Sequence, residues 1–167
     1  GYSLIDELND AGYETFWISN QELIGNRQSY VTAIAKRAKH IQFINGGSGY
    51  TYDENILPLL RETLQHPSGK KVIILHLAGT HLSYQNRYPE RFNHFKERGI
   101  SVFGDFATDF INHYDNSVLY NDYVVSKIMN EIWNLNGQSS VTYFSDHGDE
   151  VYDFRNFHGH SQAMKSK

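Results

Sequence analysis

Apolar residues recur along this chain with two different spacings, and the alternation between them predicts a layered α/β fold. Spacings of three and four residues indicate helices, whereas short alternating or unbroken apolar runs indicate strands. Helices before and between strands favour parallel pairing through right-handed crossovers. We therefore expect an α/β fold, a three-layer αβα sandwich with a mostly parallel sheet. The predicted helices span residues 3–11, 29–39, 53–65 and 108–135, and the predicted strands span 13–19, 40–44, 71–77 and 141–144.

Several boundaries of these elements carry their own signals. Gly12 should stop the first helix, and Asp53 should cap the third. Gly137 follows the longest helix, which should cover one face of the sheet. The segment 84–105 is longer than an ordinary connection, and loops of this length are often binding segments or disordered. Arg87 within it has the geometry either to bind a phosphate through two N–H groups or to pair with an acidic neighbour.

Metal-ligating side chains follow two of the predicted strands. Asp146 and His147 come directly after the strand at 141–144, and His81 lies in the loop after the strand at 71–77. If these strands are parallel neighbours, their loops meet at one sheet edge, where ligands usually bind. Zn²⁺ accepts Asp oxygens and His nitrogens at roughly 2.0–2.2 Å. We expect a zinc site there; taken alone, residues 144–150 are equally compatible with a solvated turn capped by Asp.

Other polar residues near these positions receive separate expectations. His158 and His160 follow the Asp-His pair closely, and one or both could join the same site. Asp149 could orient a ligand histidine through a hydrogen bond, whereas Glu150 is expected to be exposed. His76 lies inside an apolar strand, so we expect a hydrogen-bonded core histidine rather than a ligand.

Four segments, in order, resemble those of a known family. Together they resemble the bacterial phosphoethanolamine transferases, membrane-anchored members of the alkaline phosphatase and sulfatase superfamily, and they are most similar to the branch that modifies the lipopolysaccharide core. The segments are AGYETFWISNQ at 11–21, HLAGTHLSYQNRYP at 76–89, YDNSVLYND at 114–122 and SDHG at 145–148.

The resemblance implies roles for individual residues. Asp146 and His147 would be Zn²⁺ ligands, and the intact enzyme would hold one or two ions. His81 would lie beside the phosphoryl group or a second metal. The family's remaining histidine would be His160 or His158, because the two offer alternative alignments, of which we favour His160.

The implied reaction moves phosphoethanolamine from phosphatidylethanolamine to lipopolysaccharide, on its core or lipid A, through a covalent threonine intermediate. Nothing in the chain matches the family's nucleophile segment. Thr80 and Ser83 are interpreted as turn residues. Residues 1–167 are therefore expected to be a fragment of a single sulfatase-like catalytic domain, lacking the upstream nucleophile segment and the membrane anchor. Such a fragment should bind metal weakly and be inactive alone.

Composition adds mainly exclusions. A net charge of −4 gives no basic footprint for nucleic acid, and the absence of cysteine excludes thiolate zinc sites. No apolar run approaches the roughly 20 residues that cross a bilayer. This portion is thus expected to be soluble, and the resemblance implies that the full-length protein works at the periplasmic face of the bacterial inner membrane. Two alternatives stay open, a sulfatase or phosphodiesterase-type hydrolase of the same superfamily and a non-enzymatic α/β binding domain.

Overall fold

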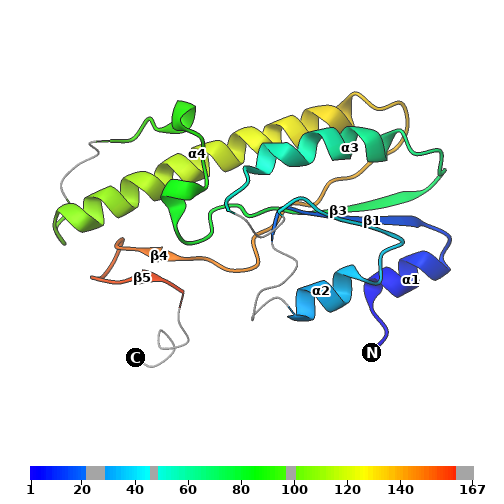
Figure 1. Ribbon diagram of the computed structural model, residues 1–167, viewed down its shortest axis with the longest axis horizontal. Coiled ribbons are helices and arrows are strands. Elements are labelled where there is room, and N and C mark those ends of the chain that lie inside the picture. The colour runs from blue at the N-terminus through cyan, green and yellow to red at the C-terminus, as the bar shows by residue number, and fades with distance from the viewer. Residues whose placement is uncertain (22–28, 46–48, 97–100, 161–167) are drawn as a thin grey trace. The chain divides into compact units, whose positions relative to one another are not determined.

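The structure is a computed structural model that describes residues 1–21, 29–45, 49–96 and 101–160 (Figure 1). The chain divides into two compact units, residues 1–78 and 79–167, and each is described by itself.

The first unit is built on a parallel sheet of three strands in the order β2-β1-β3. The register aligns Phe16 of β1 with His40 of β2 and with Ile73 of β3. This mixed α/β arrangement with a parallel sheet confirms the predicted fold class. Its elements are α1 (Leu4–Asp10), β1 (Glu14–Ser19), α2 (Ser29–Ala35), β2 (His40–Phe43), the 3₁₀ turn η1 (Asp53–Asn55), α3 (Ile56–Leu64) and β3 (Lys71–His76).

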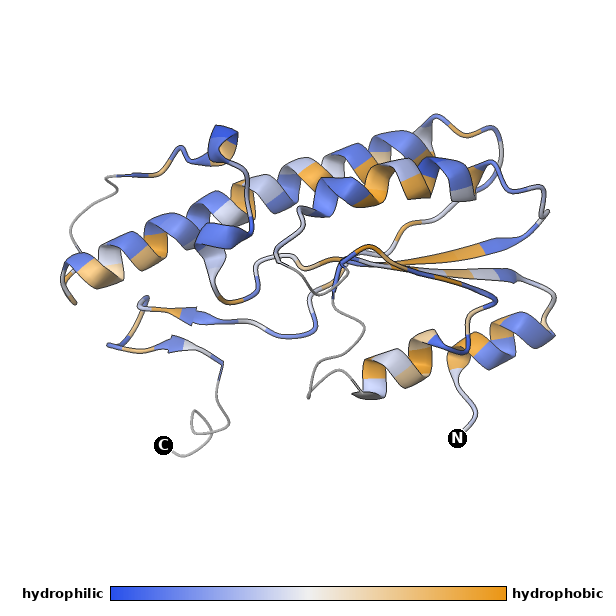
Figure 2. Ribbon diagram, in the orientation of Figure 1, coloured by the Kyte–Doolittle hydropathy of each residue, from blue (hydrophilic) through white to orange (hydrophobic). Residues whose placement is uncertain are grey.

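Helices cover both faces of this sheet. Side chains alternate between the two faces of a strand, and Trp17 of β1 packs in a buried cluster with Ile5 of α1 and Ala35 of α2. The helix α3 contacts β1 and lies on the opposite side of the sheet from α1 and α2 (Figure 1). The hydrophobic middle of β3 is visible between these layers (Figure 2). Apolar side chains on two faces are what a parallel sheet in a layered fold requires.

The ends of the first-unit helices follow the local sequence in part. Ser3 caps α1, and Asp6 completes a reciprocal capping box, in which each side chain accepts a hydrogen bond from the other residue's backbone N–H. Gly12 follows with φ of 81°, a conformation that glycine adopts without strain. The prediction that Asp53 caps the third helix is wrong, because the residue before η1 is Tyr52, and neither η1 nor α3 has a side-chain cap.

Asp53 instead joins the carboxyl ends of β1 and β3. Its buried Oδ1 accepts from Asn20 Nδ2 at 2.7 Å and from the backbone N–H of Ala78 at 2.9 Å. His76, at the end of β3, lies 3.0 Å through Nδ1 from the hydroxyl of Ser19 in β1, so it is hydrogen bonded as predicted. These contacts fix the direction in which the chain leaves β3.

We expect Asp53→Ala to lower the free energy of unfolding by about 2 kcal/mol, because it leaves the buried donors of Asn20 and Ala78 without this acceptor. Urea denaturation of the purified protein measures the change. Glu62→Ala, at an exposed position of α3, is the control and should change stability little. Equal stability of the two variants would show that the Asp53 contacts contribute nothing.

The second unit is organised around the 29-residue helix α4 (Asp105–Trp133), which confirms the helix predicted at 108–135. One stripe of α4 is buried and includes Ala107, Tyr120, Val124 and Ile128. The helix contacts the 3₁₀ turns η2 (Tyr84–Asn86) and η3 (Glu90–Phe92) and the strand β4 (Glu150–Val151), which pairs antiparallel with β5 (His158–Gly159). The long segment after His81 is thus packed on α4 over much of its length. That α4 covers a sheet face stays a prediction.

The strand predicted at residues 141–144 is not formed. These residues have no strand partner in the part of the chain that the structure describes, and Phe144 is 78% exposed. An apolar run indicates that a segment suits a sheet but does not supply the neighbouring strand that a sheet requires.

Within the described ranges, no helix combines the length and the apolar character that crossing a bilayer requires. The longest, α4, carries hydrophilic residues along its whole length (Figure 2).

Candidate metal centre

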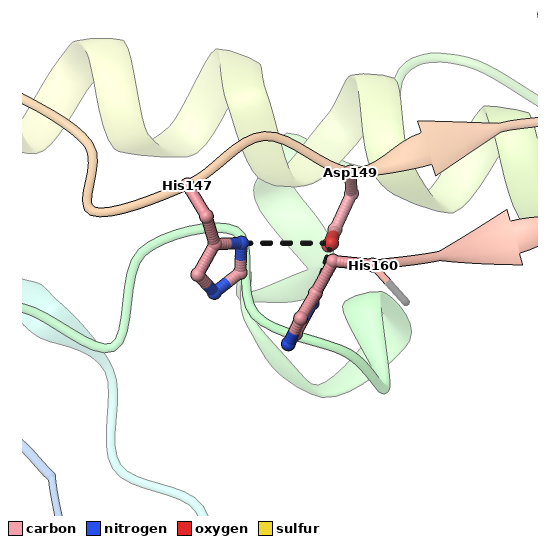
Figure 3. A group of neighbouring side chains, drawn as sticks. All are labelled: His147, Asp149 and His160. Atoms are coloured by element: carbon pink, nitrogen blue, oxygen red, sulfur yellow. Dashed lines mark hydrogen bonds and ion pairs between the residues drawn. The ribbon is translucent and has the colours of Figure 1, made fainter. Parts of the chain in front are cut away.

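The β4–β5 hairpin brings three potential metal ligands together, His147, Asp149 and His160 (Figure 3). The antiparallel register pairs Glu150 with Gly159. Asp149 and His160 are the next residues outward on each strand, so this register places them opposite each other. His147 lies two residues before Asp149, and its ring turns toward the same carboxylate (Figure 3).

The three side chains form a tight group with two nitrogen donors and one oxygen donor. Asp149 Oδ1 lies 2.9 Å from His160 Nδ1 and 3.8 Å from His147 Nδ1. The two imidazole rings are 3.9 Å apart between centroids, and one ligand atom from each residue lies within 4.8 Å of the others. Zn²⁺ binds His nitrogen and carboxylate oxygen at about 2.0–2.2 Å, and sites with three protein ligands leave a fourth position for substrate. Two imidazole nitrogens and one carboxylate oxygen this close together, with both histidines exposed, form a donor set that fits zinc.

Asp146, predicted as a ligand, lies on the other side of the His147 ring. Its Oδ2 is 3.8 Å from His147 Nε2, and its side chain is 87% exposed. The two carboxylates, Asp146 and Asp149, therefore flank opposite nitrogens of one imidazole. That Asp146 ligates a metal stays a prediction.

His81 lies close enough to Asp149 and His160 for their charges to act on its pKa, and Arg87 holds its backbone. Arg87 Nε donates to the His81 carbonyl at 3.1 Å, and Arg87 Nη2 donates to the Leu82 carbonyl at 3.1 Å. Partial burial and the Arg87 guanidinium lower the pKa of His81, although Asp149 acts in the opposite direction. The lowered pKa favours the neutral form of this imidazole near pH 7. Arg87, whose role the sequence left open, here anchors the His81 turn.

His158 lies in a different environment from His160. Its ring is 4.4 Å from the ring of Phe110 and 5.4 Å from that of Tyr152, measured between centroids. Its Nδ1 is buried and has no hydrogen-bond partner in the described part of the chain. Of the two histidines left open by the sequence, the structure brings His160 to His147 and packs His158 among aromatic rings.

Two features of this centre were missed or misjudged from the sequence. Tyr84 is buried, and its hydroxyl donates to Asp149 Oδ2 at 2.9 Å. Burial and this hydrogen bond raise the pKa of Tyr84, so it stays a proton donor. The expectation that Glu150 is exposed is wrong, because it is buried and accepts from the Phe154 N–H at 3.0 Å. For the pairing of Asp149 with His160, the sequence offered one signal, their separation by a short hairpin.

The family model described as sulfatase matches residues 2–167 of this chain. The chain belongs to the sulfatase family. Its curated relatives include phosphoethanolamine transferase EptC of Escherichia coli (strain K12) and phosphoethanolamine transferase CptA of Salmonella typhimurium (strain LT2), each 38% identical over 157 residues. Each match covers 90% of this chain but 27% of the relative, so the chain spans about a quarter of their length. The resemblance found in the four segments is confirmed.

Solved structures agree with this assignment. The crystal structure of the C-terminal periplasmic domain of EptC from Escherichia coli, in complex with Zn, matches with a TM-score of 0.90 and 35% identity, over 97% of this chain and 48% of that one. The corresponding domain of EptC from Campylobacter jejuni matches with a TM-score of 0.61 and 29% identity, over 77% of this chain and 40% of that one. A sulfatase-family chain that brings His147, Asp149 and His160 together is thus similar to a domain crystallised with zinc.

Proposed function

We propose that the full-length protein is a zinc-dependent phosphoethanolamine transferase that modifies lipopolysaccharide at the periplasmic face of the bacterial inner membrane. The observation that carries the proposal is the cluster of His147, Asp149 and His160. It occurs in a chain that is 38% identical to two proteins named as phosphoethanolamine transferases and structurally similar to a zinc-complexed periplasmic domain.

The proposed metal site consists of His147, Asp149 and His160, with Asp146 and His81 as further ligands at its edge, to the same ion or to a second one. When bound, zinc would neutralise charge on phosphoryl oxygens and lower the pKa of a nucleophilic hydroxyl. His81, whose lowered pKa favours the neutral form, is suited to accept a proton or to ligate. His158 stays the alternative to His160 for the family's remaining histidine.

The proposed reaction has two steps. A threonine oxygen attacks the phosphorus of phosphatidylethanolamine, and the bond to diacylglycerol breaks, with a proton going to the leaving oxygen. An oxygen of the lipopolysaccharide core or lipid A then attacks the phosphoethanolamine-enzyme and releases the threonine. The proposal assigns that threonine and a membrane anchor to the rest of the full-length protein, since this chain matches only 27% of the length of its relative EptC.

A hydrolase is the second candidate, because the matching family model is that of the sulfatases. The decisive test incubates the purified full-length protein with labelled phosphatidylethanolamine and lipopolysaccharide, and separately with an aryl sulfate. With the label in the phosphoethanolamine headgroup, we expect labelled lipopolysaccharide and unlabelled diacylglycerol, with no sulfate release. Release of sulfate without phosphoethanolamine transfer would establish the hydrolase instead.

A non-enzymatic binding domain predicts a third outcome. In that case, replacing both Asp146 and His147 with Ala would leave bound zinc and every measured activity unchanged. The transferase proposal expects both to fall, since the double substitution removes a ligand of the cluster and its neighbouring carboxylate.

A further inference from the structure

Tyr84 contacts the group of His147, Asp149 and His160 from the protein interior. Its hydroxyl donates to Asp149 Oδ2 at 2.9 Å. The other carboxylate oxygen, Oδ1, is the one that lies near His160 and His147. The two oxygens of Asp149 are thus divided between an interior donor and the exposed histidines.

The position of the Tyr84 ring is itself fixed by packing. The side chain is 1% exposed, and its ring meets Phe110 and Tyr114 of α4 edge-on, at centroid distances of 5.0 and 5.1 Å. Edge-to-face contacts of this kind favour one ring orientation. A buried hydroxyl also needs a hydrogen-bond partner, and here Asp149 provides it. The donor is therefore rigid, and the carboxylate must adapt to it.

We propose that Tyr84 is a positioning residue for the metal centre, which fixes the Asp149 carboxylate so that Oδ1 is presented to zinc together with His147 and His160. The inference rests on the proposed function, and it adds a residue that does not touch the metal. Outer partners that orient a ligating group contribute strongly to metal affinity. Without the hydroxyl, the Asp149 carboxylate can rotate about its terminal torsion, and Oδ1 is no longer fixed toward the histidines.

The same short segment also holds His81. Tyr84 begins the turn η2, and Arg87 directly follows it and binds the carbonyls of His81 and Leu82. Residues 84–87 therefore contact both Asp149 and the His81 loop, which lie far apart in the sequence.

The test is Tyr84→Phe in the full-length protein, with Zn²⁺ affinity measured by competition with a chromophoric chelator. The substitution keeps the packed ring and removes only the hydroxyl. We expect the affinity for Zn²⁺ to fall about tenfold to a hundredfold, the range typical of lost outer partners. Unchanged affinity would overturn the inference.

Tyr88→Phe is the matched control, because Tyr88 is also buried, with 5% exposed, on the same segment. Its hydroxyl lies 2.6 Å from His113 Nδ1 and accepts from Asn116, away from Asp149. We expect its Zn²⁺ affinity to stay within about twofold of the wild type, as for independent sites. Equal losses in the two variants, or a loss that follows the unfolding temperature of the zinc-free proteins, would mean a merely structural role and would overturn the inference.

His160→Ala separates failure of this inference from failure of the proposed function. If wild-type protein and His160→Ala bind Zn²⁺ equally, the metal centre itself is misplaced, and the inference falls with it. If His160→Ala loses zinc and Tyr84→Phe does not, the proposed function stands and only the role of Tyr84 is refuted.

Discussion

Asp149→Asn in the full-length protein is expected to reduce phosphoethanolamine transfer by at least about a hundredfold, because loss of an outer partner alone costs up to that much and Asp149 is placed as a ligand. The asparagine keeps the size of the side chain and an oxygen for Tyr84, so the change isolates the negative charge. That charge faces His147 and His160 through a carboxylate that is 8% exposed. Removing it should weaken zinc binding as well as activity.

The measurement pairs transfer from labelled phosphatidylethanolamine with zinc content per chain, determined by mass spectrometry. Asp153→Asn is the matched control, since Asp153 lies exposed in the turn of the same hairpin. It removes the same charge four residues along the chain and should leave both quantities near those of the wild type. If Asp149→Asn keeps its zinc and its activity while the protein is folded, Asp149 is no ligand, and the cluster is not the catalytic centre.

The parts of the fold that could be predicted are those whose signals are local. The helix α4 was predicted within a few residues, because its apolar positions repeat through many turns. The three strands of the parallel sheet were predicted because each is a short apolar run between helices. The stop of the first helix at Gly12 was predicted because it depends on neighbouring residues only.

The errors concern contacts between residues that are distant in the sequence. Asp53 is a residue type that often caps helices, but its carboxylate accepts from Asn20 and Ala78, each about 25 or more residues away. Residues 141–144 are apolar enough for a strand, yet strand formation depends on a partner. Glu150 has the charge of a surface residue and is buried because β4 contacts α4.

The candidate site shows the same division. The sequence named His81, His147 and His160 as candidates because they lie in loops after predicted strands, although the strand predicted at 141–144 before His147 is not formed. The described structure brings His160 opposite Asp149, and so close to His147, through the register of a hairpin whose strands are two residues long, which no periodicity reveals. For the same reason Asp149 was expected only as a partner of a ligand, and Tyr84, 65 residues away, was not considered at all.

The largest effect on the fold of the second unit is expected from Asn116→Ala. Asn116 is fully buried in α4, and its Oδ1 accepts from the backbone N–H groups of His94 and Phe95 at 2.9 and 2.8 Å. Its Nδ2 donates to the carbonyl of Phe95 at 2.9 Å. One side chain thus provides the hydrogen bonds that the backbone of His94 and Phe95 would otherwise find in a helix or a sheet. Alanine leaves the two N–H groups without an acceptor, at a cost of about 3 kcal/mol.

Hydrogen–deuterium exchange measures this cost where it arises. A loss of about 3 kcal/mol should accelerate exchange of the amides of His94 and Phe95 roughly a hundredfold, if local opening limits exchange. Asn130→Ala, at an exposed position of the same helix, should leave this exchange unchanged. Because the segment from Tyr84 to Phe95 is continuous with the turn that contacts Asp149, the loosened variant should also bind zinc more weakly. Wild-type exchange at both amides in Asn116→Ala would show that the segment is held by its aromatic contacts alone.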